Sequence, residues 1–511
     1  MTHIFLYGPS GVGKSTIGKI LAGNLNLPLT DLDHIIEINT GMSIPKIMEE
    51  HGETKVRDLE STALKQIIND RESVIALGGG ALLRDENRAL IENNGKVILL
   101  MAESDTLLER LKNDSRKRPL LAGDLKLELT SYLERRAEHY ASFPLKVRVD
   151  GKSIEQIAYQ AQVMLGRHHL SAMGAYDVVV QNNGVEQLGE MLKSRGLQNP
   201  ILVTDENMAK LHAEKVMAAL RRCGYEPKVI TLPPGEQHKN LENVSVLWKS
   251  FLAHRLDRDS TVIALGGGVI SDLSGFAAST YMRGIAWVGV PTTLLSMADA
   301  ALGGKTGFDL PEGKNLIGSF YPPKLVLADP SLLFTLPEAE LISGIAEVVK
   351  HGIISDPELF ELCSRGLDWV KENLEEVVKR AMAVKIKIIE VDPYEKGFRA
   401  ALNLGHTVGH AVELVSKFKL RHGEAVAIGT VIEAKYAERM GIAVRGLADQ
   451  ISKTMSVLGL PVSIPDEISR EEIVAVMRVD KKKTATVIRF ALPVEIGKVE
   501  LVDVTDLEDV L

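Results

Sequence analysis

Residues 8–15, Gly-Pro-Ser-Gly-Val-Gly-Lys-Ser, match the pattern G-x-x-x-x-G-K-S in full. The pattern works only between a buried strand and a helix, because its glycines let backbone N–H groups curl around phosphate oxygens at the start of that helix. The flanking residues suit both elements: 4–7 are apolar, and 17–25 carry apolar side chains at helical spacing. This stretch therefore predicts an α/β fold with a parallel sheet for the first part of the chain, and it predicts nucleotide binding.

Polar residues in and beyond this loop indicate how a phosphoryl group could be transferred. Lys14 is suited to reach the β- and γ-phosphates of a nucleotide, and Ser15 is suited to bind Mg²⁺. Asp31-Leu-Asp33 follows the expected helix. If this segment is extended, its alternate side chains point the same way, and both carboxylates face the metal and the acceptor.

Arginines and a glycine turn complete the pattern of the first part of the chain. Residues 74–80, Val-Ile-Ala-Leu-Gly-Gly-Gly, indicate a buried strand that ends in a glycine turn. Arg57 precedes an apolar helical stretch, and further arginines lie in 115–121 and 136–140. Such arginines suit a carboxylated acceptor and the charge of a transferring phosphoryl group. For any single arginine, a solvated helix face is the simpler interpretation.

Taken together, these motifs resemble shikimate kinase over residues 1 to about 165. Two registers are blurred, because Arg116 precedes Arg118 and Arg135 precedes Arg136; the Arg-Pro-Leu-Leu and Arg-x-x-x-Tyr frames favour the second of each pair. The resemblance implies that Arg118 closes on ATP from a lid and that Asp31 lies near the metal. The implied ATP and Mg²⁺ contacts are Gly11, Gly13, Lys14, Ser15, Thr16, Asp31 and Arg118. The implied shikimate contacts are Asp33, Arg57, Gly79, Gly80 and Arg136, and the implied catalytic residues are Lys14, Asp33 and Arg118.

Length, net charge, cysteine content and apolar runs limit the classes of protein to which this chain can belong. The length of 511 residues predicts about three domains, and the net charge of −8 argues against nucleic acid as a partner. Only Cys223 and Cys363 occur, which excludes a disulfide framework and a cysteine-rich zinc site. No apolar run approaches the roughly 18 residues that span a membrane, and the chain opens on an expected strand rather than a targeting segment. We expect a cytoplasmic enzyme that acts on small molecules, with no nucleic-acid or membrane partner.

A change of pattern near residues 166–174 predicts a domain boundary. A helix is expected over 153–165 and a new strand over 176–180. Alternating strands and helices then resume, and residues 262–268 repeat 74–80 letter for letter. Because the flanking residues differ, the repeat indicates a second buried strand ending in a glycine turn rather than a duplicated domain.

Histidines and carboxylates crowd residues 403–424. At about 100° per residue, His406, His410 and Glu413 fall on one face of a helix. The opposite face is apolar and suited to packing. Neutral imidazole is the commonest metal ligand, so the pattern predicts a divalent metal or catalytic site. Spacing alone leaves open which of these residues are ligands.

A further ligand is available upstream of the histidines. Glu347 and Lys350 are neighbours on one face of an expected helix. A surface ion pair is the simpler interpretation, but the helix is apolar around them. Glu347 with His406 and His422 would give a Glu/His/His set, which is one of those expected of catalytic zinc with an open fourth position.

From about residue 174 to the C-terminus, the sequence closely resembles 3-dehydroquinate synthase. The motifs that carry this resemblance are Gly-Gly-Gly-x-x-x-Asp, Pro-Thr-Thr-Leu-Leu, Gly-Gly-Lys-Thr-Gly, Gly-Lys-Asn, Ala-Glu-Val-x-Lys, Asn-x-Gly-His-Thr-x-Gly-His-Ala, His-Gly-Glu-Ala-Val and Asp-Lys-Lys. A small departure is Ser271, where glycine is usual before the aspartate. The resemblance implies NAD⁺ in an N-terminal lobe, with zinc and substrate in a cleft before a helical lobe.

The same resemblance implies roles for individual residues. Arg283 would reach a neighbouring subunit's site, and one of Lys481 and Lys482 would contact the substrate. The implied ligands of Zn²⁺ or Co²⁺ are Glu347, His406 and His422. The implied NAD⁺ contacts are Asp205, Glu236, Lys239, Gly267, Gly268, Asp272, Thr292, Thr293, Lys305 and Lys314. The other implied substrate and catalytic residues are Asp299, Lys305, Asn315, Lys350, Lys385, Arg399, Asn403 and His410.

The sequence therefore predicts an α/β protein in three parts. A P-loop kinase domain with a parallel sheet occupies 1–165, an α/β NAD-binding lobe 174–335, and an all-helical metal- and substrate-binding lobe 336–511. We expect a homodimer through the synthase part.

The predicted function is that of a bifunctional enzyme of the shikimate pathway. The kinase would convert shikimate to shikimate 3-phosphate with ATP. The synthase would convert 3-deoxy-D-arabino-heptulosonate 7-phosphate to 3-dehydroquinate and phosphate. The product of neither step is the substrate of the other, so direct channelling is not implied. The alternative is a metal-dependent polyol dehydrogenase fused to a nucleotide-sensing P-loop module, and it should release NADH stoichiometrically.

Overall fold

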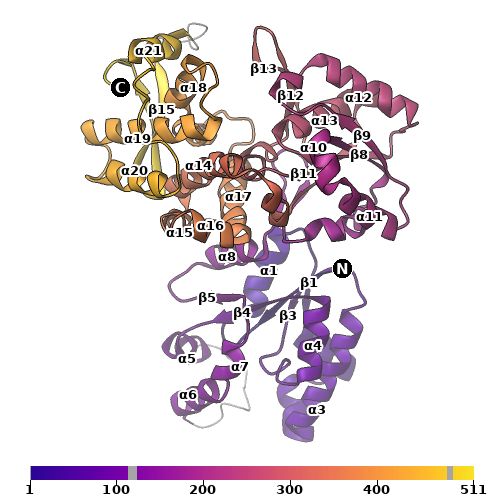
Figure 1. Cartoon of the computed structure of the whole chain (residues 1–511). Coiled ribbons are helices and arrows are strands. Elements are labelled where there is room, and N and C mark those ends of the chain that lie inside the picture. The colour runs from indigo at the N-terminus through magenta and orange to yellow at the C-terminus, as the bar shows by residue number, and fades with distance from the viewer. Residues whose placement is uncertain (1, 113–123, 480–486) are drawn as a thin grey trace. The chain divides into compact units, whose positions relative to one another are not determined.

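The computed structural model describes residues 2–112, 124–479 and 487–511 (Figure 1). The chain forms two compact units, Met1–His169 and Leu170–Leu511. Among these described residues, no helix combines the length and the apolar character that crossing a membrane requires.

The first unit is built on a parallel sheet with the strand order β2-β3-β1-β4-β5. β1 (His3–Tyr7) lies at its centre and is buried along its whole length. Alternate side chains of a strand point to opposite faces, so Ile4 and Leu6 join one apolar cluster while Phe5 and Tyr7 join another. The other strands are β2 (Leu29–Asp31), β3 (Val74–Ala76), β4 (Gly95–Met101) and β5 (Lys146–Arg148).

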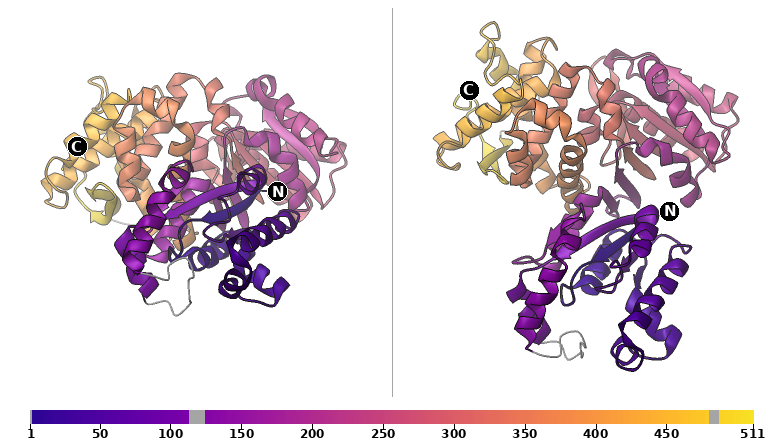
Figure 2. Two further views of the ribbon diagram at one scale, coloured as in Figure 1. Left: turned by 90° about the horizontal axis from the view of Figure 1, so that it is seen from below. Right: turned by 60° about the horizontal axis from the view of Figure 1, so that its bottom comes forward.

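Helices cover both faces of this sheet (Figures 1 and 2). Because β1 is central and parallel to β3, the loop that leaves its carboxyl end lies beside the turn that leaves β3. The fold thus brings the phosphate loop and the first glycine turn to one edge. The helices are α1 (Lys14–Asn24), α2 (Leu32–Thr40), α3 (Ile44–Ile67), α4 (Asp85–Asn94), α5 (Ser104–Lys112), α6 (Leu125–Arg135), α7 (Ala137–Ala141) and α8 (Ile154–Leu165).

The expected extended segment at Asp31 and Asp33 is wrong. β2 ends at Asp31 and α2 begins at Leu32, so the two aspartates do not alternate along a strand. Asp31 instead caps α2, and its Oδ1 accepts the backbone N–H of Asp33 at 3.1 Å. A short acidic side chain can accept hydrogen bonds from the first free N–H groups of a helix. Asp31 therefore favours the start of a helix here over a longer strand.

The second unit opens with a parallel sheet whose strands follow the order β7-β14-β11-β10-β8-β9. Apolar clusters cover its two faces. β10 (Ser260–Gly266) is wholly buried, and α13 (Gly268–Thr280) begins just after it. The predicted buried strand and glycine turn are therefore confirmed. The remaining strands are β7 (Tyr176–Val180), β8 (Gln198–Asp205), β9 (Lys228–Leu232), β11 (Ala286–Pro291) and β14 (Leu325–Ala328), and β6 (Arg167–Leu170) spans the boundary between the units in the sequence.

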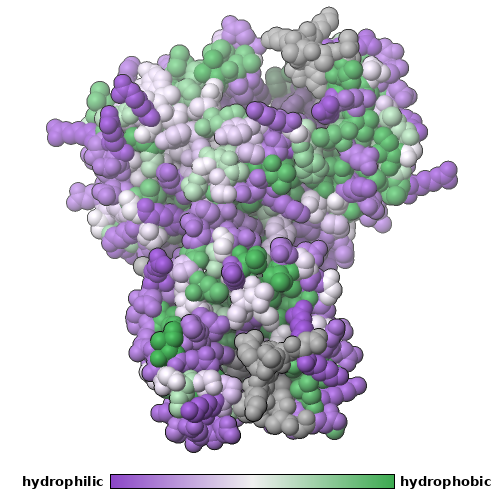
Figure 3. Space-filling view, turned by 180° about the vertical axis from the view of Figure 1, so that it is seen from behind, coloured by the Kyte–Doolittle hydropathy of each residue, from purple (hydrophilic) through white to green (hydrophobic). Residues whose placement is uncertain are grey.

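Helices and one hairpin accompany this sheet. β12 (Lys305–Leu310) pairs antiparallel with β13 (Gly313–Phe320), and β13 is largely exposed. On the face of the molecule in Figure 3, hydrophobic and hydrophilic residues are interspersed. The helices are α9 (Leu188–Ser194), α10 (Glu206–Met208), α11 (Glu214–Arg222) and α12 (Leu241–Ala253), with short turns η2 (Gly184–Gln187), η3 (Ala209–Ala213), η4 (Glu236–His238), η5 (Tyr281–Arg283), η6 (Ser296–Ala300) and η7 (Pro330–Thr335).

The last part of the chain is helical, as predicted, but it is not all-helical. β15 (Ile488–Glu495) and β16 (Lys498–Val504) form an antiparallel ribbon whose apolar side chains join the helical core. Such a ribbon depends on tertiary burial, which the local pattern did not reveal. The helices are α14 (Glu338–Ser355), α15 (Pro357–Cys363), α16 (Leu367–Glu372), α17 (Leu374–Val391), η8 (Phe398–Asn403), α18 (His406–Val415), α19 (His422–Arg439), α20 (Leu447–Val457) and α21 (Arg470–Val479).

Glycines allow α18 and α19 to pack backbone to backbone. A Cβ on Gly429 would collide with the backbone oxygen of Gly405, and one on Gly409 would lie 3.0 Å from the backbone oxygen of Ala425. Gly405 has a φ of 76° just before α18, which favours glycine. This close approach lets the histidines at the starts of the two helices meet.

Candidate active sites

The phosphate loop follows β1 directly. Gly8, Gly11 and Gly13 have φ values of 143°, 84° and 101°, which residues with side chains rarely adopt. The Nζ of Lys14 donates hydrogen bonds to the backbone oxygens of Gly8, at 2.9 Å, and Pro9, at 3.1 Å. The lysine is thus held across the loop, where the phosphates of a nucleotide would lie.

Two oxygen-bearing side chains, Ser15 and Asp31, and the half-buried carboxylate of Asp33 lie beside this loop. The Oγ of Ser15 donates a hydrogen bond to Oδ2 of Asp31 at 2.6 Å. A hydroxyl and a carboxylate suit Mg²⁺, which prefers oxygen ligands. Burial raises the pKa of Asp33, although the positive charge of Lys14 opposes the rise. Thr16 lies on the exposed side of α1.

The glycine turn after β3 makes room for side chains from α2 and α3. A Cβ on Gly78 would lie 2.6 Å from Oε1 of Glu60 and 2.8 Å from Oδ1 of Asp33. A Cβ on Gly80 would collide with the guanidinium of Arg57. The turn therefore needs glycine because charged groups converge on its backbone.

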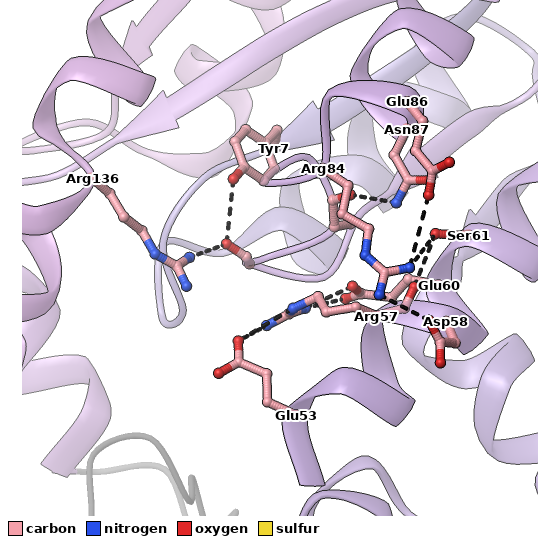
Figure 4. Close-up of polar contacts among 12 residues, drawn as sticks. Tyr7, Glu53, Arg57, Asp58, Glu60, Ser61, Arg84, Glu86, Asn87 and Arg136 are labelled. Atoms are coloured by element: carbon pink, nitrogen blue, oxygen red, sulfur yellow. Dashed lines mark hydrogen bonds and ion pairs between the residues drawn. The ribbon is translucent and has the colours of Figure 1, made fainter.

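Carboxylates surround Arg57 on two sides (Figure 4). Its Nη1 donates to both oxygens of Glu60, at 2.8 and 2.6 Å, and its Nε and Nη2 donate to Oε1 of Glu53, at 3.3 and 2.8 Å. The Glu60 side chain is only 2% exposed, whereas that of Glu53 is 46% exposed. An exposed ion pair contributes little, so Glu53 is the more weakly held of the two carboxylates. The sequence analysis missed Glu60, whose only signal is its position three residues after Arg57 on a helix.

Arg136 reaches the same turn from the end of α6 (Figure 4). Its Nη1 donates to the backbone oxygen of Gly79 and to the hydroxyl of Tyr132, the latter at 2.6 Å. The guanidinium carbon also lies 4.0 Å from the centroid of the Tyr132 ring. Within the described chain, Nε and Nη2 of Arg136 donate no hydrogen bond, so they remain to bind an anion.

Of the two arginine pairs whose registers were blurred in the sequence, the structure describes only Arg135 and Arg136. Arg135 is exposed, and its Nε donates to the backbone oxygen of Ser131 in its own helix at 3.2 Å. It therefore faces a different environment from Arg136. Arg116 and Arg118 both lie outside the described residues, so the lid arginine stays a prediction.

In the second unit, Glu347 of α14, His406 of α18 and His422 of α19 meet. Each offers a ligand atom within 4.8 Å of the others. Oε1 of Glu347 lies 3.4 Å from Nε2 of His406 and 3.6 Å from Nε2 of His422. The carboxylate is 0% exposed and forms an ion pair with Lys350; among the described residues its oxygens have no hydrogen bond of good geometry. An incompletely satisfied buried carboxylate facing two ring nitrogens fits a divalent cation.

The three candidate ligands differ in how their surroundings shift their pKa values. Burial raises the pKa of Glu347, but the charge of Lys350 and the imidazoles hold it well below its usual range. Burial and the charge of Lys350 lower the pKa of His406 to about 3. Burial also lowers the pKa of His422, but its contacts with the negatively charged carboxylates of Glu347 and Glu413 outweigh burial and raise the pKa to about 9. His406 is thus neutral at pH 7, and His422 would release a proton on binding a metal.

Outer groups orient the two imidazoles. Nδ1 of His406 contacts the backbone oxygen of Leu404 at 3.2 Å, and Nδ1 of His422 contacts Oε2 of Glu413 at 3.3 Å. Such contacts fix the tautomer and ring orientation of a ligating histidine. Glu413 therefore lies behind the candidate ligands, whereas the ring of His410 lies 5.1 Å from that of His406, centroid to centroid.

A second cluster, of which His351 and Lys385 are buried and Asp299 is half-buried, adjoins the Glu/His/His set. The Nζ of Lys385 donates to Oδ1 of Asp299 at 2.5 Å and to its backbone oxygen at 2.6 Å. Burial raises the pKa of Asp299, but the charge of Lys385 outweighs it and holds the value well below the usual range. His351 offers a ring nitrogen within 4.8 Å of oxygens of Asp299 and Glu347. The sequence analysis missed His351, although it directly follows Lys350.

The other predicted substrate residues are spread around this centre. Lys305 forms an ion pair with Glu395. Arg399 is 2% exposed, and a Cβ on Gly303 would lie 2.5 Å from its Nη2. Asn403 is exposed at the end of η8. Lys481 and Lys482 lie outside the described residues, and Arg283 is exposed with a φ of 69°.

Lys239 organises the residues predicted to contact NAD⁺. Its Nζ lies 2.6 Å from Oδ2 of Asp272 and donates to Oδ1 of Asn315 at 2.5 Å. Burial raises the pKa of Asp272 to about 6, against the charge of Lys239. Beside them, a Cβ on Gly267 would lie 3.3 Å from Cγ2 of Thr293, and Gly268 begins α13.

Some predicted NAD⁺ contacts do not join this group. The Nζ of Lys314 lies 3.6 Å from Oε1 of Glu413, on the side of the candidate metal ligands. Asp205 caps α10 through the backbone N–H groups of its first turn. Glu236, by contrast, does belong to the group, because from η4 it adds negative charge near Lys239 and Asp272. Thr292 buries a hydroxyl that has no hydrogen-bond partner among the described residues.

The fold and these sites define a phosphate-binding α/β kinase domain followed by a two-lobed enzyme with a candidate metal centre. Family models described as shikimate kinase, 3-dehydroquinate synthase N-terminal and 3-dehydroquinate synthase C-terminal match residues 10–165, 229–343 and 344–483. The 3-dehydroquinate synthase of Nostoc punctiforme is 42% identical over 337 residues, which cover 64% of this chain and 93% of that protein. The synthase of Symbiobacterium thermophilum is 42% identical over 331 residues, which cover 63% and 92%. The chain belongs to the 3-dehydroquinate synthase family and carries a shikimate kinase domain ahead of it.

Solved structures agree with this assignment. A 2-epi-5-epi-valiolone synthase from Streptomyces hygroscopicus, with NAD⁺ and Zn²⁺ bound, has a TM-score of 0.60 and 28% identity, covering 66% of this chain and 94% of its own. A 2-deoxy-scyllo-inosose synthase complexed with carbaglucose-6-phosphate, NAD⁺ and Co²⁺ has a TM-score of 0.61 and 25% identity, covering 66% and 96%. The chain is a bifunctional enzyme of the shikimate pathway, with kinase and synthase activities. The polyol dehydrogenase alternative is not favoured.

Proposed function

We propose that the first unit transfers the γ-phosphoryl group of ATP to shikimate at the glycine turn after β3. The convergence of Asp33, Arg57 and Arg136 on this turn, beside the phosphate loop, carries the proposal. The two arginines would hold the carboxylate of shikimate, because a guanidinium matches a carboxylate in two-point contact. Asp33 would take the proton of the acceptor hydroxyl, a role that its raised pKa suits.

Residues of the phosphate loop would serve the nucleotide. Lys14 would neutralise charge on the transferring phosphoryl group, and Ser15 and Asp31 would hold Mg²⁺ through their oxygens. The test is whether ADP formation depends on shikimate. A nucleotide-sensing module would hydrolyse or bind ATP regardless of the acceptor, so ADP formation unaffected by shikimate would contradict the proposal.

We propose that the second unit uses NAD⁺ and Zn²⁺ or Co²⁺ to convert 3-deoxy-D-arabino-heptulosonate 7-phosphate to 3-dehydroquinate and phosphate. The buried Glu347 carboxylate, facing Nε2 of both His406 and His422, is the observation that carries this proposal. When bound, the ion supplies Lewis acidity and NAD⁺ supplies a reversible hydride acceptor.

The chain's own residues would position the substrate in this reaction. The buried cations Lys350, Lys385 and Arg399 gather beside the candidate ligands. They would hold the carboxylate and phosphate of the substrate in a site from which water is largely excluded. His410, whose ring adjoins those of both candidate histidine ligands, would transfer a proton as a general acid or base.

A phosphate-release assay tests the synthase activity. With the heptulosonate phosphate and a catalytic amount of NAD⁺, phosphate should appear in large excess over the cofactor, and a zinc chelator should stop it. A dehydrogenase would instead accumulate NADH in step with substrate loss and release no phosphate, and that result would refute the proposal.

We also propose that the synthase part forms a homodimer in which Arg283 reaches the neighbouring site. Exposed apolar side chains on the β12–β13 hairpin support a covered surface: Leu316, Ile317 and Phe320 are 54%, 40% and 48% exposed. Sedimentation of the purified chain tests it. Mixing an inactive Glu347→Ala chain with an Arg283→Ala chain should restore activity if the two copies complement each other, and no restoration would count against shared sites.

A further inference from the structure

Tyr7 lies between the two halves of the kinase site but belongs to neither predicted set. It is the last residue of β1, directly before the phosphate loop, and it is 0% exposed. Its hydroxyl lies 3.4 Å from the backbone oxygen of Gly79 (Figure 4). The same hydroxyl lies 3.1 Å from Nε2 of His139. A buried hydroxyl needs hydrogen-bond partners. Here they come from the glycine turn after β3 and from α7.

The Gly79 backbone oxygen is a meeting point for several donors. It accepts a charge-assisted hydrogen bond from Nη1 of Arg136, a bond from Tyr7 and a long contact from the hydroxyl of Tyr132 at 3.5 Å. The turn also packs against the phosphate loop, because a Cβ on Gly79 would lie 3.6 Å from the backbone oxygen of Gly8. The position of this peptide therefore affects how Arg136 is held.

Through His139, the hydroxyl of Tyr7 is also in contact with α7, the helix that follows Arg136. A hydroxyl has one proton. If Tyr7 donates that proton to Gly79, then Nε2 of His139 must carry a proton and donate it to the Tyr7 oxygen. Burial and the charges of Arg88 and Arg136 lower the pKa of His139, which favours a neutral ring with one N–H. Each contact along the series His139, Tyr7, Gly79 and Arg136 then pairs one donor with one acceptor.

We infer that Tyr7 is a positioning residue for the shikimate half of the kinase site. By holding the Gly79 peptide, it fixes Nη1 of Arg136 and leaves Nε and Nη2 aimed at the carboxylate of the acceptor. Lys14 is anchored independently by the backbone oxygens of the phosphate loop, so the nucleotide half does not depend on the Tyr7 hydroxyl. The inference rests on the proposed role of Arg136.

Tyr7→Phe tests this role in the full-length chain. The ring contacts of Tyr7 with Tyr140 and Phe143, at centroid distances of 5.9 and 5.3 Å, would persist. The KM for shikimate should rise about 3- to 10-fold, the effect of losing one internal hydrogen bond. The KM for ATP and kcat should stay within about twofold of the parent on the same reasoning, and synthase activity serves as the internal measure of protein concentration.

Tyr140→Phe is the matched control. Tyr140 is buried in the same aromatic cluster, but its hydroxyl has no hydrogen-bond partner of good geometry among the described residues. This variant should leave the KM for shikimate unchanged. If Tyr7→Phe does not fold, His139→Leu removes the other end of the network and should also raise the shikimate KM selectively.

Three outcomes would overturn the inference. An unchanged shikimate KM in Tyr7→Phe, with a large rise in Arg136→Lys, would refute only the positioning role. Parallel changes in kcat and in both KM values would show that Tyr7 merely stabilises the fold. An unchanged shikimate KM in Arg136→Lys would place the acceptor elsewhere and would also remove the proposed role of Arg136.

Discussion

Glu347 owes its proposed role to its surroundings rather than to its residue type. Replacing Glu347 with Ala removes one of three candidate ligands, so bound zinc should fall to a small fraction and synthase turnover should be abolished. NAD⁺ should still bind, because Lys239 and Asp272 lie on other elements. Metal analysis after dialysis and an NAD⁺ titration measure the two effects. Glu338→Ala, an exposed change on the same helix, should keep metal and activity; stoichiometric zinc in Glu347→Ala would contradict the ligand set.

Asp33 should give the kinase a distinctive pH dependence. The base must be ionised to accept a proton, and burial raises its pKa above the usual value. Activity should therefore be lost on acidification at a higher pH than the ordinary aspartate value of about 3.9 would predict. The profile of kcat/KM for shikimate against pH measures this limb. Asp33→Asn should lower kcat about 100-fold or more, whereas Asp58→Asn on exposed α3 surface should not; a near-normal rate in Asp33→Asn would remove Asp33 as the base.

At the level of elements, the close packing of α18 and α19 brings His406 and His422 together. Gly429→Ala would place a Cβ against the backbone oxygen of Gly405. Separating the helices should cost about 1–3 kcal/mol of stability in the second unit and should weaken metal binding. Thermal unfolding and competition with a metal-binding dye measure these effects.

A matched change at an exposed helix position, Gly23, separates packing from helix propensity. A Cβ on Gly23 of α1 would meet no atom within 4 Å, so Gly23→Ala should leave stability equal or raise it by up to about 1 kcal/mol. Unchanged metal affinity in Gly429→Ala would mean that the helix spacing does not set the ligand geometry.

At the level of the whole molecule, the division into Met1–His169 and Leu170–Leu511 predicts separable responses to ligands. ATP with Mg²⁺ and shikimate should stabilise the kinase unit, and NAD⁺ should stabilise the synthase unit, each by about 2.7 kcal/mol at a hundredfold excess over Kd. A zinc-selective chelator in excess Mg²⁺ should abolish only synthase activity. Calorimetry and paired assays test this; a single transition shifted equally by every ligand would show that the units unfold together.

Local sequence determined the phosphate loop, both buried strands with their glycine turns, and the helix that aligns His406 with His410. These features follow from contiguous residues, since glycine φ values and side-chain periodicity act over a few positions. The apolar helix around Glu347 made this residue a candidate partner of the histidines. The resemblance to 3-dehydroquinate synthase then implied the ligand set, which spacing alone left open.

Tertiary structure decided the relations between distant segments. It made Asp31 a helix cap, added the β15–β16 ribbon, and placed Glu413 behind His422 rather than among the candidate ligands. It also joined Tyr7 to Gly79 and His139, which no local pattern links. Such contacts form only when the chain closes long loops to bury them, so the sequence names the participating residue types while packing chooses their partners.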